Sequence, residues 1–174
     1  MENVWILGGL RSFIGVKDGI YRHIPAEVLG AQVLKEIKNR FSLKDEEIDY
    51  IIGGNAVAGG GNITRLAALT AGLDEMIPAV TLDLQCGSAL ESITAAAAKI
   101  ESGLADLVIA GGFESSSTQP VRMWSGSLRK ETPRACSCAQ VLRTSSTSNQ
   151  MVGFASGNRV LSFKMIAGSS LPTQ

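Results

Sequence analysis

Cys86 is the residue whose type and position best suit nucleophilic chemistry. It follows residues 78–84, an apolar run typical of a buried strand, and precedes residues 87–102, whose apolar spacing is helical. A thiol at a helix N-terminus lies near unpaired N–H groups and the positive end of the helix dipole, which favour a thiolate and a developing oxyanion. The small residues Gly87, Ser88 and Ala89 leave room for a substrate carbonyl. The alternative is a buried, inert cysteine, the commoner state of a free thiol.

The elements around Cys86 alternate between short apolar strands and amphipathic helices. Strands are predicted over residues 4–7, 50–52, 78–84 and 106–112. The first two run into a Gly-Gly pair, and the fourth ends in one. Helices are predicted from Pro25 to Arg40, over residues 64–71 and over residues 87–102. This alternation predicts an α/β layered domain with a mostly parallel sheet covered on both faces.

The regular pattern ends near Trp124, and charge changes nearby. Through Glu114 the sequence holds 9 basic and 15 acidic side chains, whereas from Ser115 onward it holds 7 basic side chains and Glu131 alone. Residues 125–174 contain ten serines and no apolar spacing that persists for two helical turns. We therefore predict a domain over residues 1–124 and an irregular Ser/Arg-rich tail over residues 125–174, either disordered or encoded in a shifted reading frame.

The composition excludes several other classes of protein. With 45% hydrophobic residues, 174 residues suffice for a core, and the zero formal charge argues against a nucleic-acid binder. No apolar run approaches the roughly 18 residues of a membrane span, so no membrane partner is expected. The N-terminus lacks the pattern of a secretory signal, and three cysteines do not form a disulfide framework. These features predict a cytoplasmic protein.

Several ordered motifs surround Cys86. One is Leu82-Asp83-Leu84-Gln85-Cys86-Gly87-Ser88-Ala89-Leu90, and it is followed by Ala110-Gly111-Gly112-Phe113-Glu114-Ser115-Ser116-Ser117. Together they resemble the active-site block of the thiolase family. Upstream, Arg11–Gly15 resembles the family's Arg-Thr-Pro-x-Gly start. Residues 54–61 with Thr64-Arg65 resemble its glycine loop and following helix. The resemblance extends over about residues 4–120.

The resemblance implies the N-terminal half of a thiolase-like βαβαβ fold and an acyl-CoA acyltransferase of fatty acid metabolism, similar to acetyl-CoA C-acetyltransferase. In that family the cysteine matching Cys86 attacks an acyl-CoA thioester and carries the acyl group as a thioester intermediate. A second substrate then forms or breaks a carbon–carbon bond. Coenzyme A thioester is the substrate, and neither a cofactor nor a metal is implied. A half-fold leaves apolar helix faces uncovered, so a homo-oligomer is expected.

Other groups that the family needs do not appear in this sequence. Its activating histidine, second cysteine and Asn-based oxyanion partner belong to the C-terminal half, and no Gly-His-Pro motif occurs here. The single histidine, His23, is predicted to have a surface or loop-packing role. Cys136 and Cys138 lie in no family motif, and two cysteines without further ligands do not predict a zinc site. The resemblance therefore implies an incomplete catalyst.

Departures from the family pattern keep two alternatives open. Asp83-Leu84 stands where thiolases usually carry Asn-Arg, and Ser116 replaces a usual methionine. An aspartate three residues before the nucleophile is similar to ketoacyl synthases, a sister group. The alternatives are a truncated non-catalytic thiolase relative and a ketoacyl-synthase-like condensing-enzyme fragment. The glycine loop lacks the Gly-Lys-Ser/Thr ending of a phosphate-binding loop, so a turn is expected there.

Overall fold

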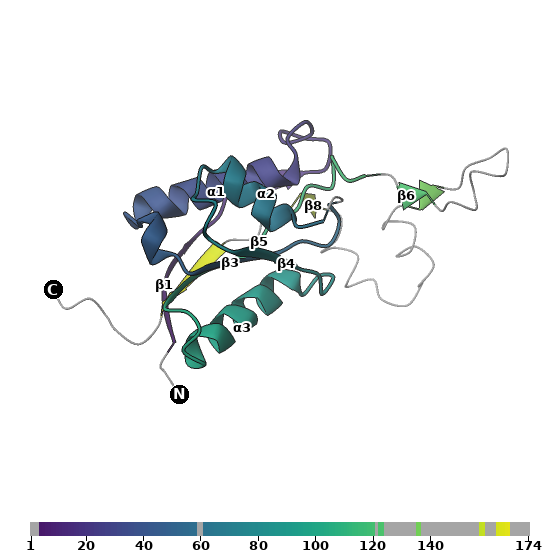
Figure 1. The fold of residues 1–174 in the computed structure, drawn as a ribbon. Helices are drawn as coiled ribbons and strands as arrows, with labels where there is room; N and C mark the ends of the chain where they lie inside the picture. The colour runs from purple at the N-terminus through teal and green to yellow at the C-terminus, as the bar shows by residue number, and fades with distance from the viewer. Residues whose placement is uncertain are drawn as a thin grey trace.

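A five-stranded mixed sheet forms the centre of the computed structural model (Figure 1). The structure describes residues 4–58 and 61–120, and the backbone of residues 122–123, 135–136, 157–158 and 163–167. The strand order is β1 (Trp5–Leu10), β9 (Phe163–Ala167), β5 (Leu107–Gly112), β3 (Tyr50–Gly54) and β4 (Ala79–Leu82). Strand β3 pairs in parallel with both β4 and β5, whereas β9 is antiparallel to both β1 and β5.

Helices cover both faces of this sheet. Helices α1 (Ala26–Arg40) and α2 (Ile63–Thr70) lie on one face, and α3 (Ser88–Glu101) lies on the other (Figure 1). A short helix η1 (Asp45–Glu47) leads into β3. Two small ribbons pair β2 (Gly15–Val16) with β8 (Gly157–Asn158) and β6 (Arg122–Met123) with β7 (Ala135–Cys136). The predicted α/β class with a mostly parallel sheet is confirmed.

Alternation along the strands divides the core into two layers. Ile51 and Ile109 pack toward α1 and α2, whereas the adjacent Ile52 and Val108 pack toward α3. Successive side chains of a strand point to opposite faces, so a strand that is buried on both faces must be apolar throughout. The Val/Ile-rich runs of β3 and β5 therefore belong at the centre of the sheet.

The Gly-Gly pairs belong to the strands. The prediction that β1 and β3 end before their glycines was wrong, since β1 continues to Leu10 and β3 to Gly54, whereas the predicted end of the fourth strand at Gly112 is confirmed. A Cβ on Gly8 would collide with the ring of Phe41, and a Cβ on Gly53 would collide with the side chain of Thr64. A Cβ on Gly54 would lie 2.5 Å from the backbone nitrogen of Ala89. These glycines permit close packing of neighbouring elements on the strands.

The predicted boundary at Trp124 lies outside the described residues, as does most of the segment 125–174. Strand β9 belongs to that segment and occupies a defined place in the sheet, where Trp5 pairs with Ala167 and Leu107 pairs with the same residue on the other side. The division into residues 1–124 and 125–174 therefore stays a prediction.

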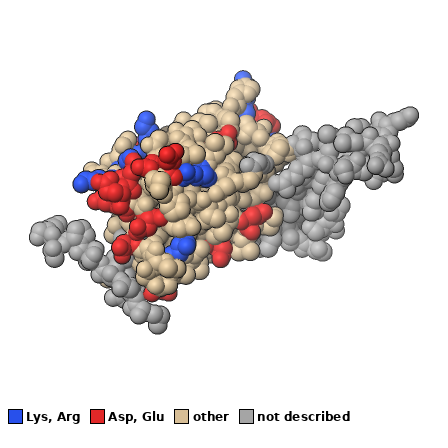
Figure 2. Space-filling model, in the orientation of Figure 1, with Lys and Arg blue, Asp and Glu red and all other residues tan. Residues whose placement is uncertain are grey.

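Acidic side chains gather on one side of the molecular surface, at the left of Figure 2, where α1 ends and η1 follows. Two ion pairs lie in this region. Lys38 Nζ is 2.7 Å from Asp45 Oδ2, and Arg40 Nη2 is 3.0 Å from Glu36 Oε1. Lys38 and Arg40, the basic residues in the last turn of α1, thus pair with carboxylates as well as lying near the negative end of the helix dipole.

Candidate active site

The loops that follow β3, β4 and β5 meet at one edge of the sheet. These three strands are parallel, so their carboxyl ends lie side by side. Helix α2 follows β3 and helix α3 follows β4, and both begin at this edge, on opposite faces of the sheet (Figure 1). In open α/β sheets the crevice outside the carboxyl ends of the strands is the usual place for a ligand.

Cys86 lies at this edge, in the turn between β4 and α3, and its side chain is exposed. Asp83 Oδ1 accepts the N–H of Gln85 at 2.9 Å. The hydroxyl of Ser88 accepts the N–H of Leu84 at 2.8 Å and donates to the carbonyl of Gln85 at 2.6 Å. The predicted position at a helix start is confirmed, and the alternative of a buried cysteine is wrong.

A local reversal of the backbone precedes Cys86. Gln85 has φ of 51°, in the left-handed region that residues other than glycine seldom adopt. The hydrogen bonds of Asp83 and Ser88 to this turn stabilise that conformation. The chain thereby turns from strand into helix within a short segment, with Cys86 on its outer side.

Ser88 and Ala89 face the sheet. Ser88 is buried, and a Cβ on Gly112 would lie 2.6 Å from the Cβ of Ala89. A Cβ on Gly54 would collide with the carbonyl carbon of Ser88. The missing side chains of Gly54 and Gly112 and the small side chain of Ala89 therefore permit close helix–sheet packing. The access of a substrate carbonyl past Gly87, Ser88 and Ala89 stays a prediction.

Glu114 joins the loop after β5 to the loop after β3. Its Oε2 accepts the N–H groups of Ala56 at 3.0 Å and Val57 at 2.9 Å, and its Oε1 accepts Asn55 Nδ2 at 3.1 Å. Asn55 is buried and also donates Nδ2 to the carbonyl of Phe113 at 2.7 Å. Side-chain and backbone groups from two strand ends therefore form one network.

Asn55 and Glu114 were not predicted as site residues. Asn55 comes directly after Gly53-Gly54, and Glu114 comes one residue after Gly111-Gly112. Both residues belong to segments that carry the thiolase resemblance. That position was the signal available in the sequence. The partners are more than fifty residues apart along the chain, so no local spacing reveals their contact.

The loop after β5 also contacts the segment before α1. Ser115 Oγ donates to the carbonyl of Ile24 at 3.1 Å, and the N–H of Asp18 donates to Ser117 Oγ at 2.9 Å. Thr118 Oγ1 donates to Ser115 Oγ at 2.9 Å. The serine-rich loop thus links the carboxyl edge of the sheet to the start of α1.

A hollow of about 370 Å³ lies beside this loop, at the starts of α1 and α2. The described residues that line it are Pro25, Ala26, Glu27, Ala58, Ile63, Thr118 and Pro120. Ala58 and Thr118 come from the two loops that Glu114 joins, so the same network shapes one wall of the hollow.

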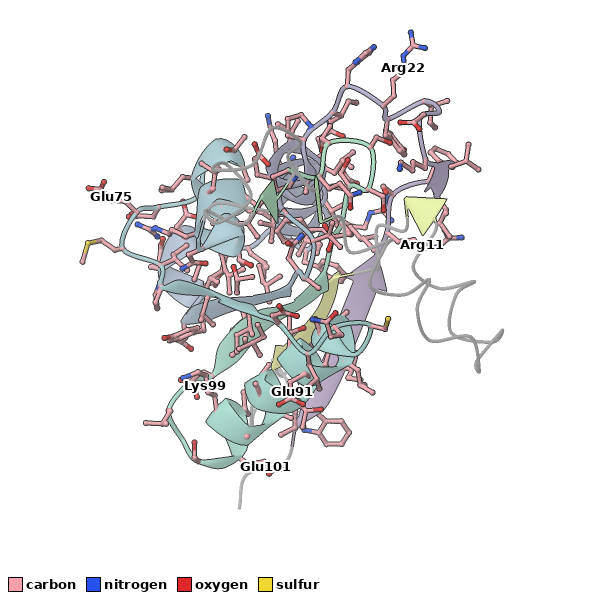
Figure 3. The ribbon with its side chains drawn as sticks, turned by 90° about the vertical axis from the view of Figure 1, so that its right-hand side faces the viewer. Arg11, Arg22, Glu75, Glu91, Lys99 and Glu101 are labelled. Carbon is pink, nitrogen blue, oxygen red and sulfur yellow. The ribbon has the colours of Figure 1, made fainter. Side chains whose placement is uncertain are left out.

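The other predicted residues lie apart from Cys86 or outside the description. His23 is exposed, and its Nε2 accepts Arg22 Nε at 2.9 Å. Arg22 projects on the opposite side of the sheet from Glu91 and Lys99 of α3 (Figure 3). The predicted surface position of His23 is confirmed. The side chain of Cys136 and the whole of Cys138 lie outside the described residues.

The described part of the chain lacks two features. Among residues 4–58 and 61–120, no three His, Cys, Asp or Glu side chains cluster closely enough to bind a metal ion. In the same ranges, no helix has both the length and the apolar character needed to cross a membrane.

Two proteins with acetyl-CoA C-acetyltransferase names are similar in sequence to this chain. The chain is 39% identical over 120 residues to the Staphylococcus aureus (strain COL) protein named "Putative acetyl-CoA C-acetyltransferase VraB", over 69% of this chain and 32% of that protein. It is 37% identical over 118 residues to "Putative acetyl-CoA C-acetyltransferase YhfS" of Bacillus subtilis (strain 168), over 68% of this chain and 32% of that protein. The chain thus spans about a third of the length of these curated relatives.

A solved structure agrees with these sequence matches. The crystal structure of the Bacillus anthracis acetyl-CoA acetyltransferase superposes with a TM-score of 0.72 at 30% identity, over 77% of this chain and 34% of that chain. The family model described as thiolase, N-terminal domain, matches residues 4–164, a range that includes Cys86, Asn55 and Glu114. The chain therefore belongs to the thiolase family.

Proposed function

We propose that this chain carries out thiolase-type acyl transfer, with Cys86 as the nucleophile and an acyl-CoA thioester as the substrate. The observation that supports the proposal is an exposed thiol at the start of α3, on the carboxyl edge of the sheet, in a chain of the thiolase family. The names of the relatives favour acetyl-CoA as the acyl donor. We place this activity in the fatty acid metabolism of the cytoplasm.

The proposed step forms one bond and breaks another. The Cys86 thiolate attacks the carbonyl carbon of the thioester, and the carbonyl oxygen gains negative charge. Backbone N–H groups at the start of a helix stabilise such charge. The intermediate then collapses, the bond between the carbonyl carbon and the sulfur of CoA breaks, and CoA leaves with the electron pair and takes up a proton. The acyl group remains on Cys86 as a thioester.

The same proposal limits the chain to this half-reaction. Further turnover needs an acid or base near Cys86 to handle the proton of the second substrate. The single histidine, His23, is exposed and hydrogen-bonded to Arg22. Arg22 lies on the opposite side of the sheet from Lys99 of α3 (Figure 3). We expect no measurable cleavage of acetoacetyl-CoA by the purified chain, and robust cleavage would contradict this limit.

Intact-mass measurement after incubation with acetyl-CoA tests the half-reaction. We expect a mass increase of one acetyl group, which peptide mapping assigns to Cys86. The Cys86→Ser variant should lose the adduct, whereas the double variant Cys136→Ser/Cys138→Ser should keep it. A sample unfolded in urea controls for non-specific acylation of thiols.

The absence of an adduct on a folded sample would refute the proposal. Circular dichroism and a cooperative melt establish folding in that experiment. The result would favour the alternative of a non-catalytic thiolase relative. An equal yield of adduct on the folded and urea-unfolded samples would also refute it, because the fold would then contribute nothing to the reaction.

We also propose that the chain self-associates. Large apolar side chains are exposed at several places on the described surface, among them Ile6 (61%), Phe13 (82%), Leu90 (70%) and Leu104 (73%). Exposed apolar area of this kind favours association. Sizing chromatography with light scattering should give a mass above that of one chain, and a monodisperse monomer would contradict the proposal.

A further inference from the structure

We propose that Asn55 and Glu114 are positioning residues that fix the turn carrying Cys86. The inference rests on the proposed role of Cys86 as the reactive thiol. Neither side chain takes part in the covalent chemistry of Cys86. Their contribution is to set the relative positions of three strand ends and the first turn of α3.

Hydrogen bonds surround the Glu114 carboxylate. Backbone N–H groups of Ala56 and Val57 donate to Oε2, while Asn55 Nδ2 at 3.1 Å and the N–H of Ser115 at 3.3 Å donate to Oε1. Neither ion pair found among the described residues includes Glu114. Hydrogen bonds to a charged acceptor are stronger than neutral ones, so this carboxylate orders the loop after β3.

Asn55 connects all three strand ends. Its backbone N–H donates to the carbonyl of Leu82, the last residue of β4, at 3.1 Å. Its Nδ2 donates to Phe113 and Glu114 beyond β5, and its Oδ1 accepts the N–H of Ala58 at 3.1 Å. A buried amide that uses both its donor and its acceptor groups has a single well-defined orientation.

The strand ends transmit this arrangement to Cys86 through two routes. The first is covalent, because the turn of residues 83–87 starts directly after Leu82. The second is steric, because Gly54 and Gly112 contact the backbone of Ser88 and the methyl group of Ala89 in the first turn of α3. A shift of β3 relative to β5 therefore moves the helix start that carries the thiol.

The Glu114→Gln variant tests the proposal against a matched control. Gln keeps the size of the side chain but places an NH₂ group where the carboxylate accepts N–H groups. The control is Asp49→Asn: Asp49 Oδ2 accepts the N–H groups of Asp106 at 2.7 Å and Leu107 at 3.0 Å at the opposite end of β3 and β5. The rate of Cys86 alkylation by iodoacetamide at fixed pH, resolved by peptide mapping, is the readout.

We expect Glu114→Gln to slow alkylation of Cys86 about tenfold, a loss typical of a misplaced reactive group. Asp49→Asn should alkylate at the wild-type rate, even where its melting temperature falls. Equal rates for wild type and Glu114→Gln would overturn the proposal, as would equal slowing in both variants.

A swapped pair separates positioning from general loss of stability. Asn55→Asp alone places two carboxylates about 3 Å apart, judged from the 3.1 Å bond that it replaces. In the double variant Asn55→Asp/Glu114→Gln, the new amide of residue 114 donates to the new carboxylate of residue 55. We expect the double variant to react several-fold faster than Asn55→Asp. A double variant slower than both single variants would overturn the proposal.

Hydrogen exchange on the wild-type chain gives a test that needs no variant to fold. Coupling between two sites is reciprocal, so alkylation of Cys86 should change the exchange rates of the Ala56 and Val57 amides by about threefold or more. The Asp106 and Leu107 amides should not change. Unchanged exchange at Ala56 and Val57 would overturn the proposal.

The two proposals fail in different ways. An absent acetyl adduct on wild type refutes the proposed acyl transfer, while alkylation and exchange still report on the position of Cys86. A normal adduct with unchanged alkylation in Glu114→Gln refutes the positioning role alone.

Discussion

The two ends of the parallel strands are stabilised in different ways. At the amino ends, exposed Asp49 accepts two N–H groups from the start of β5, and one partly buried ion pair joins Lys38 to Asp45. At the carboxyl ends, buried Asn55 and partly buried Glu114 form a network, and glycines bring the strands against α3.

This difference shows where the fold tolerates change. Exposed polar contacts are individually weak because water competes for the same groups. In a closely packed region, water cannot replace a lost hydrogen bond of the network, and a larger side chain has no space to occupy. The carboxyl end, which carries Cys86, is therefore the end where small substitutions should cost most.

The largest effect should come from Gly54→Ala. The added Cβ would lie 2.5 Å from the backbone nitrogen of Ala89, and neither backbone can move without disrupting β3 or α3. We expect a loss of about 3 kcal/mol in the free energy of unfolding, measured by urea denaturation. Gly87→Ala is the control: its Cβ would lie 3.3 Å from the carbonyl oxygen of Leu84, and it should cost less than about 1 kcal/mol. Equal losses would contradict the comparison.

Thr81→Val should have the next largest effect. The hydroxyl of Thr81 accepts the N–H of Thr64 at 2.9 Å and donates to Asn62 Oδ1 at 2.8 Å, which joins β4 to the start of α2. The same hydroxyl also lies 2.9 Å from Thr64 Oγ1. Valine keeps the shape and removes all three contacts, so we expect a loss of about 2 kcal/mol. Thr94→Val on the exposed side of α3 should change stability by less than about 0.5 kcal/mol in the same urea titration. A negligible effect of Thr81→Val would show that these hydrogen bonds do not stabilise the contact between β4 and the start of α2.

Asp49→Asn at the amino end should cost about 1 kcal/mol, because an amide oxygen accepts the two N–H groups more weakly than a carboxylate. Thermal denaturation followed by circular dichroism measures the change. A loss as large as that of Gly54→Ala would remove the proposed difference between the two ends.

The smallest effect should follow Glu36→Gln, which removes the exposed pair with Arg40 on α1. We expect less than about 0.5 kcal/mol, decreasing further at high salt. Urea titrations at two salt concentrations check this, and a loss above about 1 kcal/mol would indicate that the amino end is more strongly stabilised than its exposure implies.

The sequence alone was sufficient for the strand–helix alternation. The apolar spacing of the first helix predicts its buried face, and four of the five residues on that stripe are buried while Val28 is partly buried; the five are Val28, Leu29, Val33, Leu34 and Ile37. The Val/Ile runs predict β3 and β5 because central strands are apolar on both faces. The position of Cys86 followed from the same pattern, since it stands between a strand and a helix.

The rest depends on contacts between distant residues. Strand β9 has only five residues, and its partners β1 and β5 are far away in the chain, so local pattern gave no reason to predict it. The contacts of Glu114 with Ala56 and Val57 are likewise non-local. Periodicity reports which face of an element is buried, and it does not report which loop ends meet.

The place of β9 has a consequence for the order of events during synthesis. Strand β1 is synthesised first, yet among the described strands it pairs with β9 alone, so Trp5 cannot pair until Ala167 has been synthesised. Closing so long a loop slows folding, and until it closes β5 has an open edge. A nascent chain with one open edge on β5 can pair with a strand of another chain at that edge. Chaperone demand and yield on expression should therefore depend on how quickly residues 163–167 reach the gap between β1 and β5.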